Sequence, residues 1–325
     1  MNNPLVSIAV ITYNQAAFID EALTSALNQD YENLEVVVAD DGSTDRTAEI
    51  ILTYVQKYPG RLVALTGCPN LGVTGNSNRA LKACKGKYIA FQGGDDILLP
   101  GKISRQVEWM ETNRERVLCG HDVEIFESHS GRKLALWSEN YPLRSGRGAA
   151  LVVRYGVPFA ATAVMVRADD IPSFGFDPRV SLVSDWKLWI DCLAAGREFG
   201  YVDGVYARYR TAELNLSRHT QAITQDILIT LALVESSYPQ LIRYCKYKRA
   251  QAYYDLGIHH MKNQNFSPAR NLFQAALKTT LISWKLPIAL LLTYLPISWS
   301  HHILQNRPTP RSLAEFILTI IKKQA

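Results

Sequence analysis

The sequence lacks the cysteine and glycine patterns that mark several common classes of protein. Its five cysteines are scattered and none belongs to a C-x-x-C pair, which argues against a disulfide framework and against a zinc site. Neither G-x-G-x-x-G nor G-x-x-x-x-G-K-[ST] follows a predicted strand, so dinucleotide-binding and P-loop classes lose their main support. The start, MNNPLVSIAVITYN, has no basic segment and only a short apolar run, so we expect no secretory signal and a cytoplasmic chain.

Acidic residues are scarce near the carboxyl terminus. The 325 residues have a formal net charge of +5, and 47% of them are hydrophobic, as expected for a globular chain. Residues 239–325 contain 12 Lys and Arg but only two acidic residues, a balance of +10, so the remaining 238 residues carry −5. We therefore predict two regions with different roles, 1–238 and 239–325.

Apolar, β-branched runs alternate with helical patterns over roughly the first hundred residues. Strands are predicted at 5–14, 34–45, 61–67 and 87–94, with helices at 15–29, after residue 45, and at 76–84. Ser43 or Thr44 is expected to cap the second helix, with Ala48, Ile51, Leu52 and Val55 on one face. This alternation is typical of a doubly wound, mainly parallel sheet flanked by helices. The polar clusters TYN, DDGS and GGDD follow three of the strands and should meet in one crevice, where such sheets bind ligands.

Five motifs, in order, resemble those of family 2 glycosyltransferases with the GT-A fold. They are VSIAVITYN, VVVADDGSTDRT, NLGVTGNSNRAL, YIAFQGGDDILLP and SDWKLW, and the resemblance covers roughly residues 4–217. It implies a GT-A domain at 1–238, followed here by a helical carboxyl-terminal region at 239–325.

The resemblance implies that a nucleotide-diphosphate sugar lies across the strand ends. Asp41, with Asp40 beside it, would bind the base, and Arg79 would contact phosphate. The alternatives are that DDGSTD only makes a turn and a helix cap, and that Arg79 is a solvated helix residue. The donor-binding residues implied are Thr12, Tyr13, Asn14, Asp40, Asp41, Asn70, Gly72, Asn78, Arg79, Asp95 and Arg210.

The segment FQGGDD places two adjacent carboxylates, Asp95 and Asp96, directly behind a buried strand. The family has a further acidic residue where this chain has Gly93. Mg²⁺ and Mn²⁺ prefer oxygen ligands and are often held by one or two carboxylates plus substrate phosphates. We therefore expect Asp95 and Asp96 to form the site for Mn²⁺ or Mg²⁺, with one of them as metal ligand and the other in contact with ribose or phosphate; the sequence does not decide which is which. The alternative is a pair that caps the helix beginning near Pro100.

The resemblance also implies a general base and a segment that closes over the donor. SLVSDWKLWIDCLAAG predicts a helix that begins at Ser184 or Asp185, with Trp186 and Trp189 in its apolar stripe. The carboxylate of Asp185 would deprotonate the acceptor hydroxyl, although Ser184 replaces an acidic residue of the family. Downstream, Tyr209, Arg210 and Ser217 match the closing segment, while Ala212 stands where a histidine is frequent.

The basic region combines a helical pattern with short apolar segments. Residues 246–280 resemble a single tetratricopeptide-like helix pair, and the apolar run 286–299 is broken by two prolines and too short to span a bilayer. Residues 312–323 are amphipathic and end in two lysines. We hypothesise that this region lies on an anionic membrane surface, the alternative being a helical cap with basic exposed faces. No nucleic-acid recognition motif accompanies the charge.

The function these features favour is an inverting, metal-dependent glycosyltransferase of the hexosyltransferase type. A sugar would move from a nucleotide-diphosphate donor, with a UDP-sugar favoured, to a hydroxyl of a glycan or lipid-linked acceptor in the synthesis of a cell-surface polysaccharide. One alternative is a catalytically degenerate sugar-nucleotide-binding or scaffold protein, to which Gly93, Ser184 and Ala212 point. A nucleotidyltransferase is disfavoured, because TYNQAAF is not a glycine-rich basic loop.

Overall fold

The computed structural model describes residues 3–156, 158–211, 220–283 and 285–294. Contacts within the chain divide it into two units, Met1–Cys245 and Lys246–Ala325. The division falls inside one helix, whereas the sequence places its boundary between residues 238 and 239, so separate roles for the two regions stay a prediction. The predicted segment 312–323, together with Ala212 and Ser217, lies outside the described residues.

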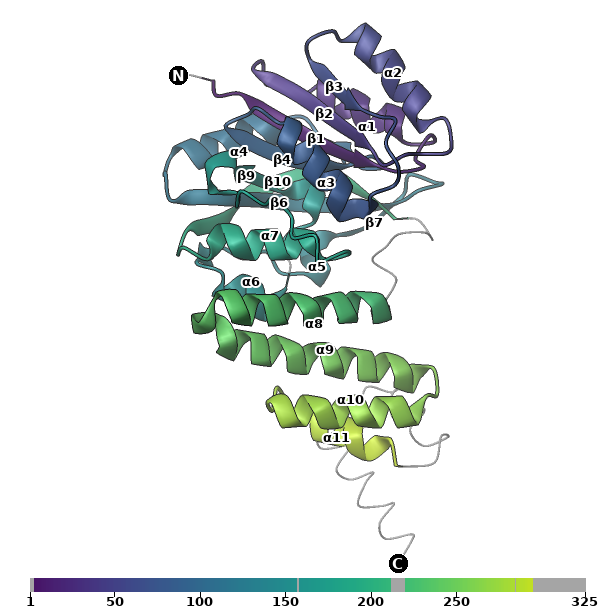
Figure 1. Cartoon of the computed structure of the whole chain (residues 1–325), viewed down its shortest axis with the longest axis vertical. Helices are drawn as coiled ribbons and strands as arrows, with labels where there is room; N and C mark the ends of the chain where they lie inside the picture. The colour runs from purple at the N-terminus through teal and green to yellow at the C-terminus, as the bar shows by residue number, and fades with distance from the viewer. Residues whose placement is uncertain (1–2, 157, 212–219, 284, 295–325) are drawn as a thin grey trace, which may run out of the picture. The chain divides into compact units, whose positions relative to one another are not determined.

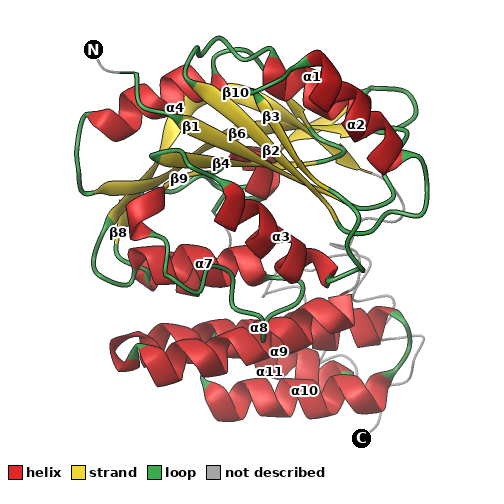
Figure 2. Ribbon diagram, turned by 45° about the horizontal axis from the view of Figure 1, so that its top comes forward, coloured by secondary structure: helices red, strands yellow, loops and turns green. Residues whose placement is uncertain are grey.

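A sheet forms the centre of the first unit (Figures 1 and 2). Four parallel strands make up one half of it, in the order β3-β2-β1-β4. Each lies within a predicted run, and both faces of β1 and β2 are buried, as the continuous apolar pattern indicates. Their bounds are β1 Val6–Thr12, β2 Leu34–Asp40, β3 Leu62–Leu65 and β4 Tyr88–Gly93.

Beyond β4 the sheet becomes mixed. β9 is antiparallel to both β4 and β6, and β6 pairs in parallel with β10. The short strand β5 then pairs with β10, while β7 and β8 pair with β6 and β10 off the main path. The bounds are β5 Ile97–Leu98, β6 Arg116–Glu127, β7 Lys133–Leu136, β8 Gly146–Arg147, β9 Met165–Arg167 and β10 Glu198–Thr211.

Helices cover both faces of the sheet, which confirms the predicted fold class. Figure 2 shows α1, α2 and α4 over one face and α3 and α7 over the other. The bounds in the first unit are α1 Ile19–Leu27, α2 Thr47–Lys57, α3 Gly72–Ala83, α4 Lys102–Glu111, α5 Trp137–Asn140, α6 Ala150–Tyr155, α7 Ser184–Leu193 and α8 Thr220–Ser237, with 3-10 turns η1 Ala161–Ala163, η2 Ala168–Asp170 and η4 Pro239–Leu241.

An aromatic cluster packs α7 against β4. The ring of Trp189 lies 5.3 Å from that of Phe91, centroid to centroid, and Phe91 in turn meets Phe176 edge-on at 5.9 Å. Trp186 and Trp189 are each 1% exposed, which confirms the predicted apolar stripe of this helix. Because buried aromatic rings contribute large apolar areas and prefer such edge-to-face geometry, this contact fixes α7 relative to the strand that leads to Asp95 and Asp96.

Two local predictions for α2 are wrong. Neither Ser43 nor Thr44 caps α2, which begins only at Thr47; Asp45 instead accepts a hydrogen bond from the Thr47 amide at 2.9 Å. Leu52 points to solvent rather than to the core. The alternative in which Asp95 and Asp96 cap the helix near Pro100 also fails, because the carboxylate beside the start of α4 is that of Asp30, 3.0 Å from the Gly101 amide.

The second unit contains the predicted helix pair. α9 (Ile242–Lys262) enters it from the first unit, α10 (Phe266–Thr279) follows, and α11 (Lys285–Leu292) packs on α10. Phe273 is fully buried at the centre of this small core, against Gly257 of α9. No helix within the described residues is both long enough and apolar enough to cross a bilayer.

Gly257→Ala is expected to destabilise the second unit. The added Cβ would lie 2.4 Å from the Cε1 atom of the buried Phe273 ring, a steric conflict that costs roughly 1–3 kcal/mol and outweighs a gain of at most about 1 kcal/mol in helix propensity. Urea denaturation followed by circular dichroism measures the change. Adding Phe273→Leu should give a double variant less destabilised than the sum of the single changes. An unchanged midpoint for Gly257→Ala would contradict the packing described.

Candidate active site

The carboxyl ends of three parallel strands lie at one level. Thr12 is paired with Asp40 across β1 and β2, and Ile11 with Gly93 across β1 and β4. Just beyond the strands, the Gly94 amide donates to the Ile11 carbonyl at 2.8 Å and the Asp41 amide to the Thr12 carbonyl at 3.0 Å. The structure therefore brings the TYN, DDGS and GGDD segments together.

The loop after β1 is joined to the loop after β2 by hydrogen bonds. Asn14 adopts a left-handed backbone conformation with φ of 51°, its amide donates to Ser43 Oγ at 2.8 Å, and its Oδ1 accepts from the Thr44 amide at 2.8 Å. Asn14 thus joins the loops that follow β1 and β2. Tyr13, by contrast, is 46% exposed, so its ring is accessible to a ligand.

The two aspartates after β2 have different partners. The carboxylate of Asp40 accepts hydrogen bonds from the amide and the hydroxyl of Ser43, which is the turn that the alternative interpretation foresees. Asp41 instead reaches the next loop, where its Oδ1 accepts from the Leu71 amide at 2.8 Å. Gly42 follows them with φ of +73°, and a Cβ there would lie 2.5 Å from the Cys68 carbonyl, so only glycine fits.

Arg79 on α3 is not a solvated helix residue. Its Nη1 donates to the Asp40 carbonyl at 3.1 Å and to Asn76 Oδ1 at 3.0 Å, while Asn76 Nδ2 donates to the Ala39 carbonyl. α3 therefore holds the end of β2 through both side chains.

The other predicted residues of this region have local partners. Asn78 bonds the backbone of Phe176 through both its Nδ2 and its Oδ1, each at 2.8 Å, which engages both ends of its amide. Asn70 Oδ1 accepts from the Gly72 amide at the start of α3. Asn78 thus positions the loop before α7, and its contact with a donor stays a prediction.

Asp95 and Asp96 lie side by side at the end of β4, with their carboxylates turned toward the same point. A Cβ built on Gly93 would lie 3.0 Å from Asp95 Oδ1 and 3.1 Å from Asp96 Oδ2. Gly94 is equally restricted, because its Cβ would meet Gln15 Oε1 at 2.4 Å and Thr12 Oγ1 at 2.6 Å. The two glycines therefore let the backbone pass close to β1 and leave space beside the carboxylates.

Burial raises the pKa of both carboxyl groups. For Asp96, which is 4% exposed, burial and the neighbouring charge of Asp95 raise the pKa well above its usual value. For the half-buried Asp95, burial raises the pKa, while hydrogen bonding to Gln15 and the charge of Arg210 oppose the rise. An additional cation beside the pair would favour the ionised forms.

Arg210 from β10 is the cation that the chain itself supplies to this pair. Its amide donates to Asp96 Oδ1 at 3.0 Å and its Nε to the Asp95 carbonyl at 2.8 Å. Its guanidinium lies over the rings of Phe18 and Phe126, each 4.6 Å away, and its Nη2 pairs with Glu21 at 2.5 Å. With these bonds and 5% exposure, Arg210 orders the Asp95–Asp96 loop, and its contact with a donor stays a prediction.

The pair suits a hard divalent cation. Two convergent carboxylate oxygens are ligands that Mg²⁺ and Mn²⁺ prefer, and such ions commonly complete their coordination with water and substrate phosphate. No group of three or more His, Cys, Asp or Glu side chains within the described ranges could hold a metal ion by itself. A cation at this place would therefore depend on the ligand as well as on Asp95 and Asp96.

Asp185 occupies the first turn of α7, as the sequence predicts. Burial raises the pKa of its carboxyl to about 6, although the Trp186 amide donates to its Oδ1 at 2.6 Å and favours ionisation. A carboxylate with this pKa is mostly ionised at pH 7 and is more basic than an ordinary aspartate, as a general base requires.

Sequence reasoning missed the residues that hold the segment before Asp185. Thr74 on α3 donates to the Val180 carbonyl at 2.7 Å, and Asp226 on α8 accepts from backbone amides of residues 181–183. The signal for Asp226 was present, since it is the only charged residue in the otherwise apolar and neutral polar stretch 220–234. A lone charge in a buried helix usually has a specific partner.

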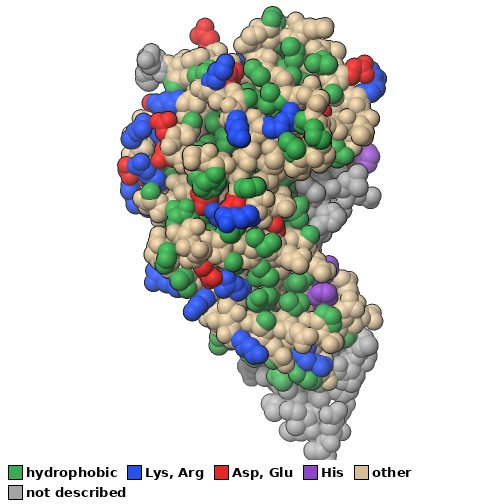
Figure 3. Space-filling model, in the orientation of Figure 1, with side chains coloured by type: hydrophobic (Ala, Val, Ile, Leu, Met, Phe, Trp, Pro, Cys, Tyr) green, Lys and Arg blue, Asp and Glu red, His purple; other side chains and the backbone are tan. Residues whose placement is uncertain are grey.

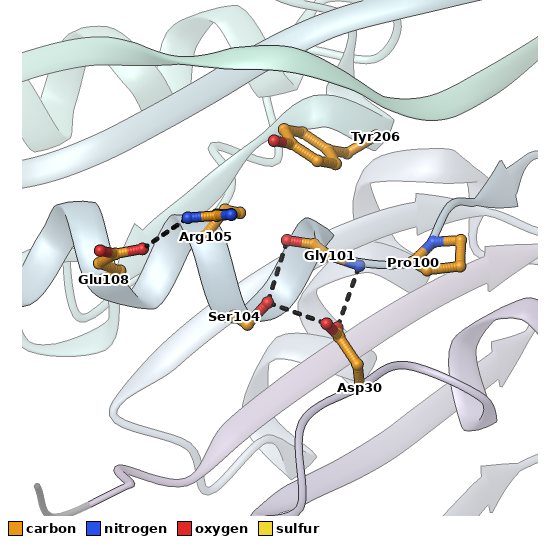
Figure 4. Close-up of a pocket in the computed structure, with 7 residues that line it drawn as sticks. All are labelled: Asp30, Pro100, Gly101, Ser104, Arg105, Glu108 and Tyr206. Atoms are coloured by element: carbon orange, nitrogen blue, oxygen red, sulfur yellow. Dashed lines mark hydrogen bonds and ion pairs between the residues drawn. The ribbon is translucent and has the colours of Figure 1, made fainter.

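The pocket drawn in Figure 4 lies apart from these residues. It has a volume of about 480 Å³ and is lined by Asp30, Pro100, Gly101, Ser104, Arg105, Glu108 and Tyr206. Asp30 Oδ1 and Oδ2 bond the Gly101 amide and the Ser104 hydroxyl within it. None of the predicted site residues lines this pocket, so it has no part in the candidate active site.

Comparisons of sequence agree with the motifs. The model of glycosyl transferase family 2 matches residues 7–167. An uncharacterized glycosyltransferase of Haemophilus influenzae is 30% identical over 194 residues, which cover 59% of this chain and 73% of that protein. The UDP-Glc:alpha-D-GlcNAc-diphosphoundecaprenol beta-1,3-glucosyltransferase WfaP of Escherichia coli is 28% identical over 230 residues, 68% of this chain and 84% of WfaP. Other matches cover less, such as 38% of a second Haemophilus influenzae glycosyltransferase.

Comparisons of structure show the same fold. S. aureus TarS 1-349 in complex with UDP-GlcNAc superposes with a TM-score of 0.62 and 17% identity, over 84% of this chain and 81% of that one. The mannosyltransferase PcManGT from Pyrobaculum calidifontis, in complex with GDP-Man and Mn²⁺, gives 0.57 and 19% identity, over 93% and 84% of the two chains. Motifs, strand-end geometry and relatives agree: the chain belongs to glycosyl transferase family 2.

Proposed function

We propose that the chain is an inverting glycosyltransferase that moves a sugar from a UDP-sugar to a hydroxyl of a glycan or lipid-linked acceptor. The observation that supports this best is the meeting of Asp41, Asp95 and Asp96 at the aligned ends of β2 and β4, beside β1. A UDP-sugar is favoured because WfaP is named for UDP-Glc and TarS was solved with UDP-GlcNAc. The name of WfaP also motivates a lipid-diphosphate acceptor and a role in cell-surface polysaccharide synthesis.

The donor would lie along the strand ends with its base over the first loops. Tyr13 offers an exposed ring there, and Asp41 a carboxylate already ordered by the Leu71 amide. Thr12, Asn14, Asp40, Asn70, Gly72 and Arg79 would shape this wall. The side chains of Asn14 and Arg79 already bond the segment at the end of β2, and those of Thr12, Asp40 and Asn70 bond residues of their own loops. These residues would therefore meet the donor mainly through their backbone.

Asp95 and Asp96 would hold a Mn²⁺ or Mg²⁺ ion, with the diphosphate as a further ligand. Asp95 is the more exposed of the two, and one oxygen of Asp96 already accepts the Arg210 amide. The ion, when bound, offsets the negative charge on the departing diphosphate. Arg210 keeps the loop in place by bonding the backbone of Asp95.

Asp185 would act as the general base of a single displacement. The acceptor oxygen forms a bond to the anomeric carbon as the bond from that carbon to the diphosphate breaks, and the hydroxyl proton passes to the Asp185 carboxylate. UDP is released and the configuration at the anomeric carbon inverts. No covalent intermediate is needed, so the site requires one base and no nucleophilic side chain.

The competing function is a degenerate donor-binding or scaffold protein. It is motivated by Gly93 and Ser184, which stand where the resemblance implies acidic residues. The raised pKa of Asp185 favours the enzyme, because burial of a carboxyl at a helix start is costly and brings a scaffold no benefit.

Asp185→Asn is expected to lower kcat about 10²- to 10⁴-fold while leaving donor affinity unchanged, because the base is lost and the donor contacts remain. UDP release from UDP-glucose, with Mn²⁺ and GlcNAc-diphosphoundecaprenol, measures it. The wild-type rate should fall as the pH drops below about 6, where Asp185 becomes protonated. Asp169→Asn, at an exposed carboxylate paired with Arg114, is the matched control and should retain full activity.

The same variant should not lose stability. Because the pKa of Asp185 is raised from 3.8 to about 6 in the folded chain, the free energy of unfolding falls as the pH rises between these two values and is then constant. Asp185→Asn should therefore unfold at the same or a higher temperature than the wild type at pH 8, with the difference vanishing below pH 4. Wild-type turnover in the folded variant would show that the assignment of the base is wrong.

We propose further that residues 239–325 form an extension that binds the anionic surface of a membrane on its cytoplasmic side. Leu281, Leu291 and Tyr294 of the second unit are each more than half exposed, at 65%, 57% and 58%. Figure 3 shows hydrophobic and basic side chains together on the visible face of this unit. Apolar side chains flanked by lysine and arginine suit an anionic lipid surface.

Flotation with phosphatidylglycerol vesicles tests this proposal. The full chain should float with these vesicles at low salt and not with neutral phosphatidylcholine vesicles, and high salt should weaken the binding. The shortened chain 1–294 should bind less, and Lys322→Glu with Lys323→Glu should do the same in the full chain. Equal flotation of all variants, or none by the full chain, would contradict the proposal.

A further inference from the structure

Three consecutive backbone amides just before α7 donate to one carboxylate. The amide of Ser181 lies 3.1 Å from Asp226 Oδ1, and those of Leu182 and Val183 lie 2.5 and 2.9 Å from Asp226 Oδ2. Val183 immediately precedes α7 and lies two positions before Asp185. Successive amides that point to one centre form an anion-binding concavity, and here a side chain from α8 occupies it.

The same segment is held from its other side by α3. Thr74 Oγ1 donates to the Val180 carbonyl at 2.7 Å, and Ser181 O lies 3.3 Å from the same hydroxyl. Thr74 belongs to the helix that also bonds the end of β2 through Asn76 and Arg79. The turn before Asp185 is therefore fixed between α3 and α8, with its amides used on one side and its carbonyls on the other.

Burial of the Asp226 carboxylate costs free energy that its hydrogen bonds must offset. Asp226 is 6% exposed. In the sequence of α8 it follows Gln225 and precedes a run of apolar residues, and one side of this helix is buried. A buried carboxylate loses hydration, and only strong hydrogen bonds offset that loss. Three amide donors next to the positive end of α7 supply them.

We propose that Asp226 is a positioning residue for Asp185. By fixing residues 181–183, it sets where α7 begins and so where the Asp185 carboxylate stands relative to the acceptor hydroxyl. This inference rests on the proposed role of Asp185 as general base. A misplacement of about 1 Å at a reacting group costs up to about 10²-fold in rate, so a residue that touches no substrate still controls turnover.

Asp226→Asn tests the proposal. The asparagine keeps the shape, but its amide nitrogen opposes at least one of the three donors. We expect kcat to fall about 10- to 100-fold in the UDP-glucose assay, with the calorimetric Kd for UDP-glucose changed less than about twofold. Thr74→Val, which removes the hydrogen bond on the opposite side, should give a smaller loss of about three- to tenfold. It also serves as the test if Asp226→Asn fails to fold.

Asp177→Asn is the matched control. Asp177 is a buried carboxylate in the loop leading to the same turn, 3% exposed, and it bonds Arg179 rather than the amides of residues 181–183. Hydrogen exchange followed by mass spectrometry supplies a readout that needs no substrate. Amides 181–183 should lose protection in Asp226→Asn and keep it in Asp177→Asn. An equal loss of activity in both variants would overturn the proposal, because it would show that any loosening of this loop lowers the activity.

The double variant Asp185→Asn/Asp226→Asn distinguishes the positioning role of Asp226 from the role of Asp185 as general base. If Asp226 acts through Asp185, the double variant is no slower than Asp185→Asn alone, whereas independent effects would multiply. Multiplying effects, or wild-type kcat in folded Asp226→Asn beside an impaired Asp185→Asn, would overturn the role of Asp226 only. Wild-type kcat in Asp185→Asn would overturn the proposed function and, with it, this inference.

Discussion

Several parts of the first unit are arranged around two adjacent carboxylates at the buried end of β4. Both carboxyl groups are poorly hydrated, which raises the pKa of each, and the neighbouring charge of Asp95 raises the pKa of Asp96 further. The chain offsets part of this cost with Arg210, whose guanidinium lies over two aromatic rings and bonds the Asp95 carbonyl, while its amide bonds the Asp96 carboxylate. A side chain at position 93 would lie against both carboxylates, so Gly93 leaves space beside them. A buried pair of like charges with space beside it suits a cation-assisted diphosphate site.

α3 connects the two chemical ends of the proposed site. Toward the donor it bonds the backbone of β2 through Asn76 and Arg79, and toward the base it bonds the turn before α7 through Thr74. Asn78 adds the backbone of Phe176, whose ring packs on Phe91 of β4. One helix thus ties the nucleotide side, the carboxylate pair and the proposed base to a common frame. Such a frame keeps reacting groups in place without reorganisation during the reaction.

The sequence predicted what depends on local pattern and could not predict what depends on distant contacts. Continuous apolar runs identified the parallel strands, and polar residues behind them identified the crevice. The cap of α2 was misplaced because Asp45, rather than Ser43 or Thr44, lies next to the first helical amide. Arg210 matched a donor-binding motif, yet its partners are residues 18, 21, 95, 96 and 126, which no spacing rule could bring together. Asp226 stood out as a lone charge in the sequence, but no spacing rule could predict that its partners are the amides of residues 181–183.

The central claim is that Asp95 and Asp96 hold the cation that holds the diphosphate. Calorimetric titration with UDP-, GDP- and dTDP-sugars, with and without Mn²⁺, tests it most directly on the wild type, Asp95→Asn and Asp96→Asn. Asp30→Asn, in the separate pocket of Figure 4, is the control. The account predicts metal-dependent binding of a UDP-sugar that is lost in the first two variants and kept in the third. Binding that is indifferent to Mn²⁺ and to both substitutions, or no binding by the folded wild type, would contradict it.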